Sequence, residues 1–269
     1  MSAIASGQIQ RVDEKGWRRG LGNLLRGEYS AWFKSSRWWK HLLMWFAIIN
    51  VMMIIMIIAS AKEDGEGPPL LFMYGIFGGM FVAIGVMIVM QRVLVGEKHA
   101  GTAAWVLSKP VTRTAFVVSR LTVNSIAILL TPVIVPGVIL YITLGLFSDL
   151  GWLSPFGLLG ALLMFSFFTF YWIALVLMMG TLSDSAAVVI AVPMALFFIF
   201  WMGTDMLPGL IYISPLLLAF TPDPNRMSTL SVSFLTGEPA YSWLPLISTV
   251  VCSIIFITIA IWRFNRQEF

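Results

Sequence analysis

Residues 96–102 read GEKHAGT and place two glycines five positions apart, a spacing that could serve nucleotide chemistry. A G-x-x-x-x-G-K-[ST] loop holds phosphates on its backbone N–H groups after a strand and before a helix. Here Thr102 stands where such a loop has its lysine, and an apolar run precedes it in place of a strand. The complete motif occurs nowhere in the sequence, so ATP, if it is relevant, is expected on another subunit.

Other residue types that support catalysis are sparse. The two histidines, His41 and His99, flank apolar runs, and the one cysteine, Cys252, lies inside such a run. The sequence shows no Ser–His pair, no paired carboxylates and no cysteine cluster with metal-ligand spacing. We therefore predict no catalytic site, no metal site and no cofactor in this chain.

The composition is that of an integral membrane protein. Of 269 residues, 59% are hydrophobic and 11% are charged, and the mean hydropathy is +0.89. Soluble domains average about 45–50% apolar and about 25% charged residues. The net charge of +4 is attributed to membrane topology and to contact with anionic lipids, and nucleic acid is not expected as a partner.

Six apolar runs are long enough to cross the membrane, since about 20 helical residues span the hydrocarbon. The predicted fold class is thus all-α, a polytopic protein with six transmembrane helices. The third run is too long for one straight crossing, and Pro132 and Pro136 are expected to kink it. The runs lie near residues 42–61, 70–91, 115–146, 155–180, 186–204 and 243–262.

Basic residues predict the orientation. With six spans both termini share one side, and 15 of the 17 Lys and Arg residues fall there, leaving Lys62 and Arg226 on the other. Lys and Arg accumulate in cytoplasmic loops. We therefore expect a multi-pass protein of the inner (plasma) membrane with both termini in the cytoplasm.

Two regions are distinguished along the chain. Residues 1–40 form a cytoplasmic segment in which an amphipathic helix, within residues 17–40, lies in the membrane interface. Residues 41–269 form the six-span domain. On its outer side, residues 205–242 are apolar but broken by Pro208 and Pro215, which predicts one or two re-entrant or interfacial helices.

Residues 97–110 predict a short helix between the second and third spans. Glu97 is placed near its start, where a negative charge suits the helix dipole, and Gly101 within it would let its backbone approach a partner. Pro110 ends it, and Thr112 can cap the third span. An ordinary interfacial loop is the alternative.

The segment GEKHAGTAAWVLSKPVTR, residues 96–113, resembles the cytoplasmic signature of ABC type-2 permeases, in which an acidic residue precedes Gly-Thr and then a Leu-Ser-x-Pro-Val-Ser/Thr-Arg segment. The interfacial helix, the six spans and the basic tail are also similar to that family. One departure is that only Glu97 and Lys98 provide charges before Gly101. The matching residues are Glu97, Gly101, Thr102, Leu107, Ser108, Pro110, Val111, Thr112 and Arg113.

This resemblance implies a permease subunit of an ATP-driven exporter. Two ATPase subunits, carrying ATP and Mg, would pair with this chain and with a second copy or homologue, and would drive alternating access. The coupling residues it implies are Glu97, Lys98, Gly101, Thr102, Leu107, Ser108, Pro110 and Arg113. A smaller second contact would involve Thr181, Ser183 and Asp184.

Small residues and methionines recur on two spans at helical spacing. Small side chains let helices approach closely, and methionine makes adaptable apolar surfaces. The resemblance implies a dimer interface or substrate path here, whereas packing within one subunit is the alternative. The residues concerned are Met73, Gly75, Gly79, Met80, Met87, Ala187, Ala191, Met194 and Phe198.

An ion-coupled secondary transporter is the main alternative function. Such carriers place ionisable residues at mid-membrane, whereas Asp149, Asp184 and Asp205 fall near span ends. An intramembrane enzyme is a third possibility that lacks its catalytic residues here. A largely apolar path suits lipids, hydrophobic peptides or drugs, and the residues do not choose among them.

Overall fold

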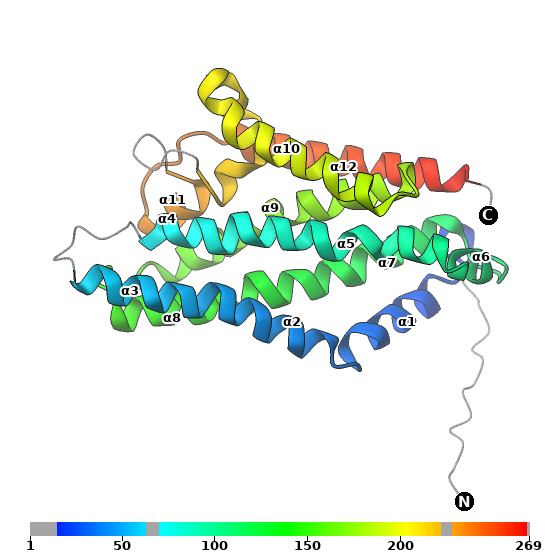
Figure 1. Ribbon diagram of the computed structural model, residues 1–269, viewed down its shortest axis with the longest axis horizontal. Coiled ribbons are helices and arrows are strands. Elements are labelled where there is room, and N and C mark those ends of the chain that lie inside the picture. The colour runs from blue at the N-terminus through cyan, green and yellow to red at the C-terminus, as the bar shows by residue number, and fades with distance from the viewer. Residues whose placement is uncertain (1–14, 63–69, 222–227, 268–269) are drawn as a thin grey trace, which may run out of the picture.

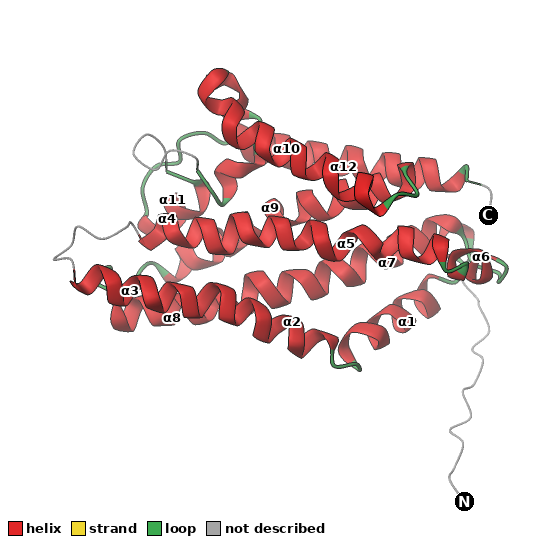
Figure 2. Ribbon diagram, in the orientation of Figure 1, coloured by secondary structure: helices red, strands yellow, loops and turns green. Residues whose placement is uncertain are grey.

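The computed structural model describes residues 15–62, 70–221 and 228–267. The described residues form helices joined by short loops, without strands (Figure 2). Six of these helical stretches are long and apolar enough to cross a membrane. They are Arg37–Ala61, Leu70–His99, Arg113–Phe147, Pro155–Leu182, Ala186–Gly203 and Leu244–Asn265. The predicted all-α fold with six spans is therefore confirmed.

Figure 1 shows the spans as a bundle with short helices at both ends. The first span comprises α2 (Arg37–Phe46) and α3 (Met52–Lys62). The second comprises α4 (Leu70–Tyr74) and α5 (Phe81–His99), and the third comprises α7 (Arg113–Ile128) and α8 (Val135–Phe147). The last three are α9 (Pro155–Leu182), α10 (Ala186–Met206) and α12 (Leu244–Asn265).

The first three spans each contain a π-helical stretch, at Ala47–Val51, Gly75–Met80 and Leu129–Ile134. The third stretch holds Pro132, which cannot donate a backbone hydrogen bond within the helix. Pro136 lies in the first turn of α8, where a proline is tolerated. The irregularity predicted for the long third span is thus found at Pro132.

The core of the bundle is centred on α9, which packs against α5, α11 (Leu230–Thr236) and α12. Its aromatic side chains Phe165, Phe168 and Trp172 are fully buried. By contrast, only 22% of the apolar stretch of α10, and the same share of α12, is buried inside the chain. Lipid or another subunit must therefore cover much of the surface of these two helices.

At one end of the bundle lie α6 (Thr102–Leu107), the start of α7 and the last turn of α12 (Figure 1). We call this end the α6 end. Helix α1 (Leu21–Phe33) approaches it and packs along α7, while α2 enters the bundle after it. A helix is thus present within the predicted residues 17–40, but it ends at Phe33, and Arg37–Lys40 already belong to α2. Its position in the membrane interface stays a prediction, and residues 1–14 lie outside the described residues.

The opposite end carries the segment between α10 and α12. It forms two 3-10 turns, Pro208–Tyr212 and Pro215–Leu218, followed by α11. Residues 216–220 are buried, and α11 packs on α9. Short helices are therefore present where the sequence predicted them, and their depth in the membrane remains a prediction.

Candidate functional site

The connection between the second and third spans differs from the single helix predicted over residues 97–110. Helix α5 continues to His99, and α6 begins only at Thr102. Gly101 separates them with a φ of +67°, in the left-handed region that favours glycine. Glu97 therefore lies in the last turn of α5 and not at a helix start, so the predicted dipole interaction is wrong.

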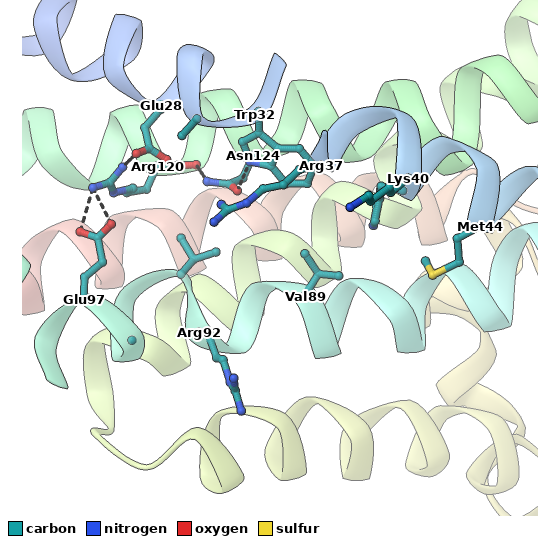
Figure 3. A pocket seen from close by; sticks show the side chains of 14 residues that line it. Glu28, Trp32, Arg37, Lys40, Met44, Val89, Arg92, Glu97, Arg120 and Asn124 are labelled. Carbon is teal, nitrogen blue, oxygen red and sulfur yellow. Dashed lines mark hydrogen bonds and ion pairs between the residues drawn. The ribbon is translucent and has the colours of Figure 1, made fainter. Parts of the chain in front are cut away.

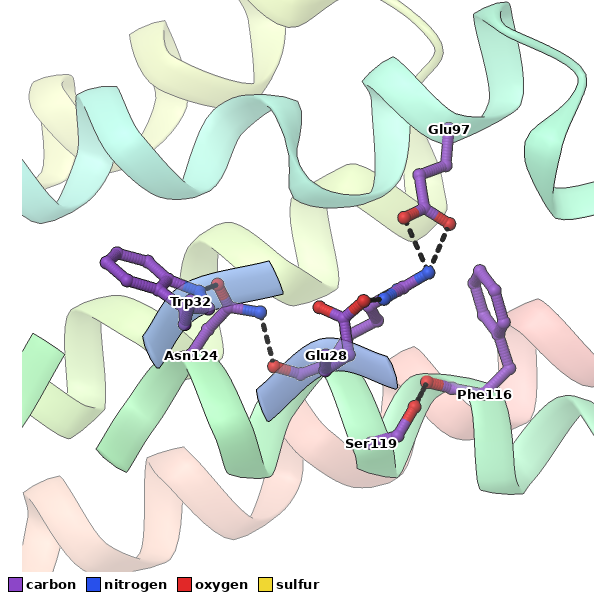
Figure 4. A network of polar contacts seen from close by, with 7 residues as sticks. Glu28, Trp32, Glu97, Phe116, Ser119 and Asn124 are labelled. Atoms are coloured by element: carbon purple, nitrogen blue, oxygen red, sulfur yellow. Dashed lines mark hydrogen bonds and ion pairs between the residues drawn. The ribbon is translucent and has the colours of Figure 1, made fainter. Parts of the chain in front are cut away.

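Glu97 instead points into the protein, toward a buried arginine of α7 (Figure 4). The Arg120 guanidinium is 2.6 and 2.8 Å from the two Glu97 carboxylate oxygens, and it also forms an ion pair with Glu28 of α1. Arg120 is only 6% exposed. One buried cation thus joins α1, α5 and α7. A carboxylate at the C-terminus of a helix needs a positive partner of this kind, because the helix dipole is negative there.

A second polar contact fixes α1 on α7 beside this arginine. The Trp32 indole N–H donates to the Asn124 side-chain oxygen over 2.8 Å, and the Asn124 amide donates to the Arg120 carbonyl over 2.7 Å (Figure 4). Trp32 and Asn124 are both buried. Because a buried polar group without a partner is costly, these bonds favour one placement of α1.

The loop between α6 and α7 is held at its far end. The Thr112 hydroxyl accepts from the Ala115 amide over 3.1 Å, which caps α7 as predicted. The same hydroxyl donates to the Trp17 carbonyl, and the Thr112 amide donates to the Arg19 carbonyl over 3.1 Å. The loop is therefore tied to the residues that precede α1.

The loop between α9 and α10 lies against the same end. The Lys98 ammonium is 3.0 Å from an Asp184 carboxylate oxygen, so the two predicted contact regions are adjacent. The Thr181 carbonyl accepts from the Gln267 amide over 2.6 Å, and Arg113 donates to the Asn265 carbonyl over 2.7 Å. Lys98 and Arg113 thus bond through their side chains, and Thr181 through its backbone carbonyl, to other segments of the chain, so we expect these three residues to position the α6 end.

The outward face of this region is formed by other residues. Thr102, Ser108 and Pro110 of the predicted set are exposed, whereas Leu107 packs against the core. Sequence reasoning missed Trp105, which is 64% exposed with the Lys109 ammonium 4.7 Å from its ring centroid. The signal was available, because a tryptophan between two polar turns is unusual for a loop that contacts only water.

The side chains of this connection do not follow one helical period. Ala103 is buried, whereas Ala100 and Ala104 are exposed. Glu97 and Lys98 are turned toward the chain. The reason is the left-handed turn at Gly101, which changes the direction of the chain so that the helical period does not continue through it.

The residues predicted for a dimer interface or substrate path do not form one surface. A Cβ on Gly75 would be 2.9 Å from the Ala219 carbonyl, and one on Gly79 would be 3.4 Å from Ala219, so both glycines pack inside the subunit. Met87 is buried, while Met73, Met80 and Met194 pack against the core. The exposed members are Ala187, Ala191 and Phe198.

The contacts of Gly75 and Gly79 are those that packing within one subunit predicts, and a dimer interface or substrate path stays a prediction for this set of residues. Within the described residues, no group of three or more His, Cys, Asp or Glu side chains gathers in a way that could hold a metal ion.

We expect Gly101→Ala to weaken the turn before α6, because φ of +67° costs a residue with a Cβ roughly 1–2 kcal/mol. No heavy atom lies within 4 Å of the added Cβ, so the cost is conformational and not steric. Gly101→Asn should retain most of the wild-type stability, since asparagine tolerates this region. Hydrogen exchange of residues 102–107 measures the effect.

Gly96→Ala is the matched control for this comparison. Gly96 lies within α5, and its added Cβ would meet only the Arg92 side chain at 3.6 Å, an ordinary contact. Alanine favours a helix by about 1 kcal/mol over glycine. Equal exchange rates after both alanine substitutions would contradict the role assigned to the Gly101 conformation.

The sequence was compared with known families and proteins. It matches the family described as ABC-2 family transporter protein over residues 3–269. No curated protein matches it. The match extends over nearly the whole chain and agrees with the six apolar helices, and membrane subunits of this family work with ABC ATPase subunits and are not themselves catalytic. The chain is thus a multi-pass membrane permease that belongs to the ABC-2 transporter family.

Proposed function

We propose that this permease is one of the two membrane subunits of an exporter, and that α6 and the turns around it form the surface that binds an ABC ATPase. The observation that carries the proposal is a short, outward-facing helix with an exposed tryptophan, placed between two helices that Arg120 joins. Arg120 links α7 to α5 through Glu97 and to α1 through Glu28, and Thr112 caps α7 directly after α6. A rigid helix between two spans passes a displacement to both of them, whereas a loose loop absorbs it.

In this proposal the outward-directed residues bind the ATPase and the inward-directed residues position them. Trp105, Thr102 and Ser108 present the surface that enters the ATPase groove. Glu97 and Lys98, through Arg120 and Asp184, keep that surface in register with the spans. Closure of two ATPases on ATP and Mg would then move α5 and α7, and with them a second permease copy, between inward- and outward-facing states.

Export and orientation belong to the same proposal. The α6 end carries the exposed Arg263 and Arg266 together with Lys109 and Arg37, as expected for a cytoplasmic end. A secondary carrier is not favoured, because the family works with ATPases and the Arg120 ion pairs lie at the α6 end, not along a path through the bundle.

Cysteine labelling tests the docking surface and the orientation together. In a Cys252→Ala background, a cysteine at Lys109 should react with a maleimide only after the cells are permeabilised, and co-expressed ATPase should protect it. A cysteine at Glu238, exposed at the other end, should react in intact cells and should not be protected. Labelling of the Lys109 position from outside, or equal labelling with and without ATPase, would refute the proposal.

A further inference from the structure

A polar cavity with a volume of about 700 Å³ lies at the α6 end, between α1, α2, α5 and α7. Four cationic side chains and two carboxylates line it, next to an apolar wall that includes Met44 and Val89 (Figure 3). Nothing in the transport proposal uses this cavity, which opens beside the ion-pair network without being part of the α6 surface.

The charges in the cavity do not balance. Glu28 and Glu97 are both engaged by Arg120. Figure 3 shows Arg37 and Lys40 reaching from α2 into the space beside α5, whereas Arg92 is directed away from it. Within the described residues, neither Arg37 nor Lys40 has a carboxylate within ion-pair distance. An anion is therefore the ligand that this cavity favours.

The depth of the cavity indicates where that anion comes from. The neighbouring Trp38 and Trp39 are exposed at the start of the first span, and tryptophan favours the level of the lipid headgroups. Met44, one turn of α2 beyond Lys40 and farther from the α6 end, forms an apolar wall of the cavity together with Val89 and Val93. A soluble anion would need only the cations, whereas a phospholipid would use both the cations and the wall.

We propose that this cavity binds the phosphate-bearing headgroup of an anionic phospholipid from the adjoining leaflet. Arg37 and Lys40, which both line the cavity, pair with the phosphate. The glycerol and first methylenes lie along Met44 and Val89. Because α2 forms one wall and α5 the other, the bound lipid bridges the first two spans.

Native mass spectrometry of the purified full-length chain tests this site. Dioleoyl phosphatidylglycerol is titrated against phosphatidylcholine with the same acyl chains, for the wild type and for the Arg37→Gln/Lys40→Gln variant. Each basic side chain near a headgroup contributes about fivefold to affinity, so the double variant should bind phosphatidylglycerol about 30-fold more weakly. Phosphatidylcholine has the same phosphate but balances it with its own ammonium group, so its binding should fall much less than that of phosphatidylglycerol.

Arg263→Gln/Arg266→Gln is the matched control, because it removes two exposed cations from the same end without touching the cavity. It should bind phosphatidylglycerol like the wild type. An equal loss in both variants, or no loss in the first, would overturn the site. Displacement of the lipid by an equal concentration of sn-glycerol 3-phosphate would also overturn the lipid site, because the cavity would then bind a soluble phosphate. Both variants should melt like the wild type, since the replaced side chains are exposed.

Discussion

Arg120→Gln should lower the apparent melting temperature of the purified permease by roughly 6–12 °C. Arg120 is 6% exposed and forms ion pairs with Glu28 and Glu97. Removing one partner of a buried pair costs about 3–5 kcal/mol, because the remaining charge is left without compensation. Here two carboxylates lose the cation that both of them pair with, and the expected cost lies at the lower end of this range because both remain partly exposed.

Two further variants distinguish the loss of the Arg120 ion pairs from a general effect of removing charge. Arg263→Gln removes an exposed cation at the same end and should change the melting temperature by less than about 2 °C. The triple variant Glu28→Gln/Glu97→Gln/Arg120→Gln should recover most of the lost stability, since neutral side chains need no compensating charge. If Arg120→Gln melts like Arg263→Gln, the network does not stabilise the fold.

The triple variant also distinguishes stability from function. It should insert and melt nearly like the wild type, yet ATP-driven transport with the cognate ATPase should remain reduced. The reason is that charge-assisted bonds are about twice as strong as neutral ones, so the neutral set holds α1 and α5 less firmly to α7. Full recovery of transport in the triple variant would assign Arg120 a purely structural role.

The features of this fold that the sequence predicted are those that local physics determines. Each span must satisfy its own backbone hydrogen bonds and bury an apolar surface in lipid, so length and hydropathy identify it. Pro132 marks the irregular third span because it lacks an N–H group, and Thr112 caps α7 because its hydroxyl reaches an amide in the next turn.

The features that were missed depend on contacts between distant segments. Glu97 pairs with an arginine 23 residues later, and Glu28 reaches the same arginine from a different helix. Gly75 and Gly79 pack against Ala219 because the segment after α10 folds back into the bundle. Neither partner can be found from the spacing of residues within one span. The left-handed φ of Gly101 depends on where α5 ends, and the sequence pattern did not predict that α5 would end at His99.

Trp105→Ala should weaken binding of the partner ATPase by roughly 30-fold or more while leaving the melting temperature unchanged. A large exposed aromatic at the centre of a contact commonly contributes 2 kcal/mol or more to binding. Trp105 is 64% exposed, so its removal takes little from the packing of α6, which rests on Ala103 and Leu107. The measurement is co-purification with the ATPase, followed by a binding titration of the purified subunits.

Trp262→Ala provides the matched control, because Trp262 is 51% exposed at the same end of the bundle and also carries a cation over its ring, Arg266 at 4.4 Å. Exposed tryptophans at a membrane boundary commonly anchor a protein in the headgroup layer, and this alternative applies equally to both residues. If both substitutions weaken ATPase binding alike, or neither does, Trp105 is a lipid anchor and α6 is not the docking helix. If only Trp105→Ala loses the ATPase, the exposed face of α6 is the surface that the ATPase binds.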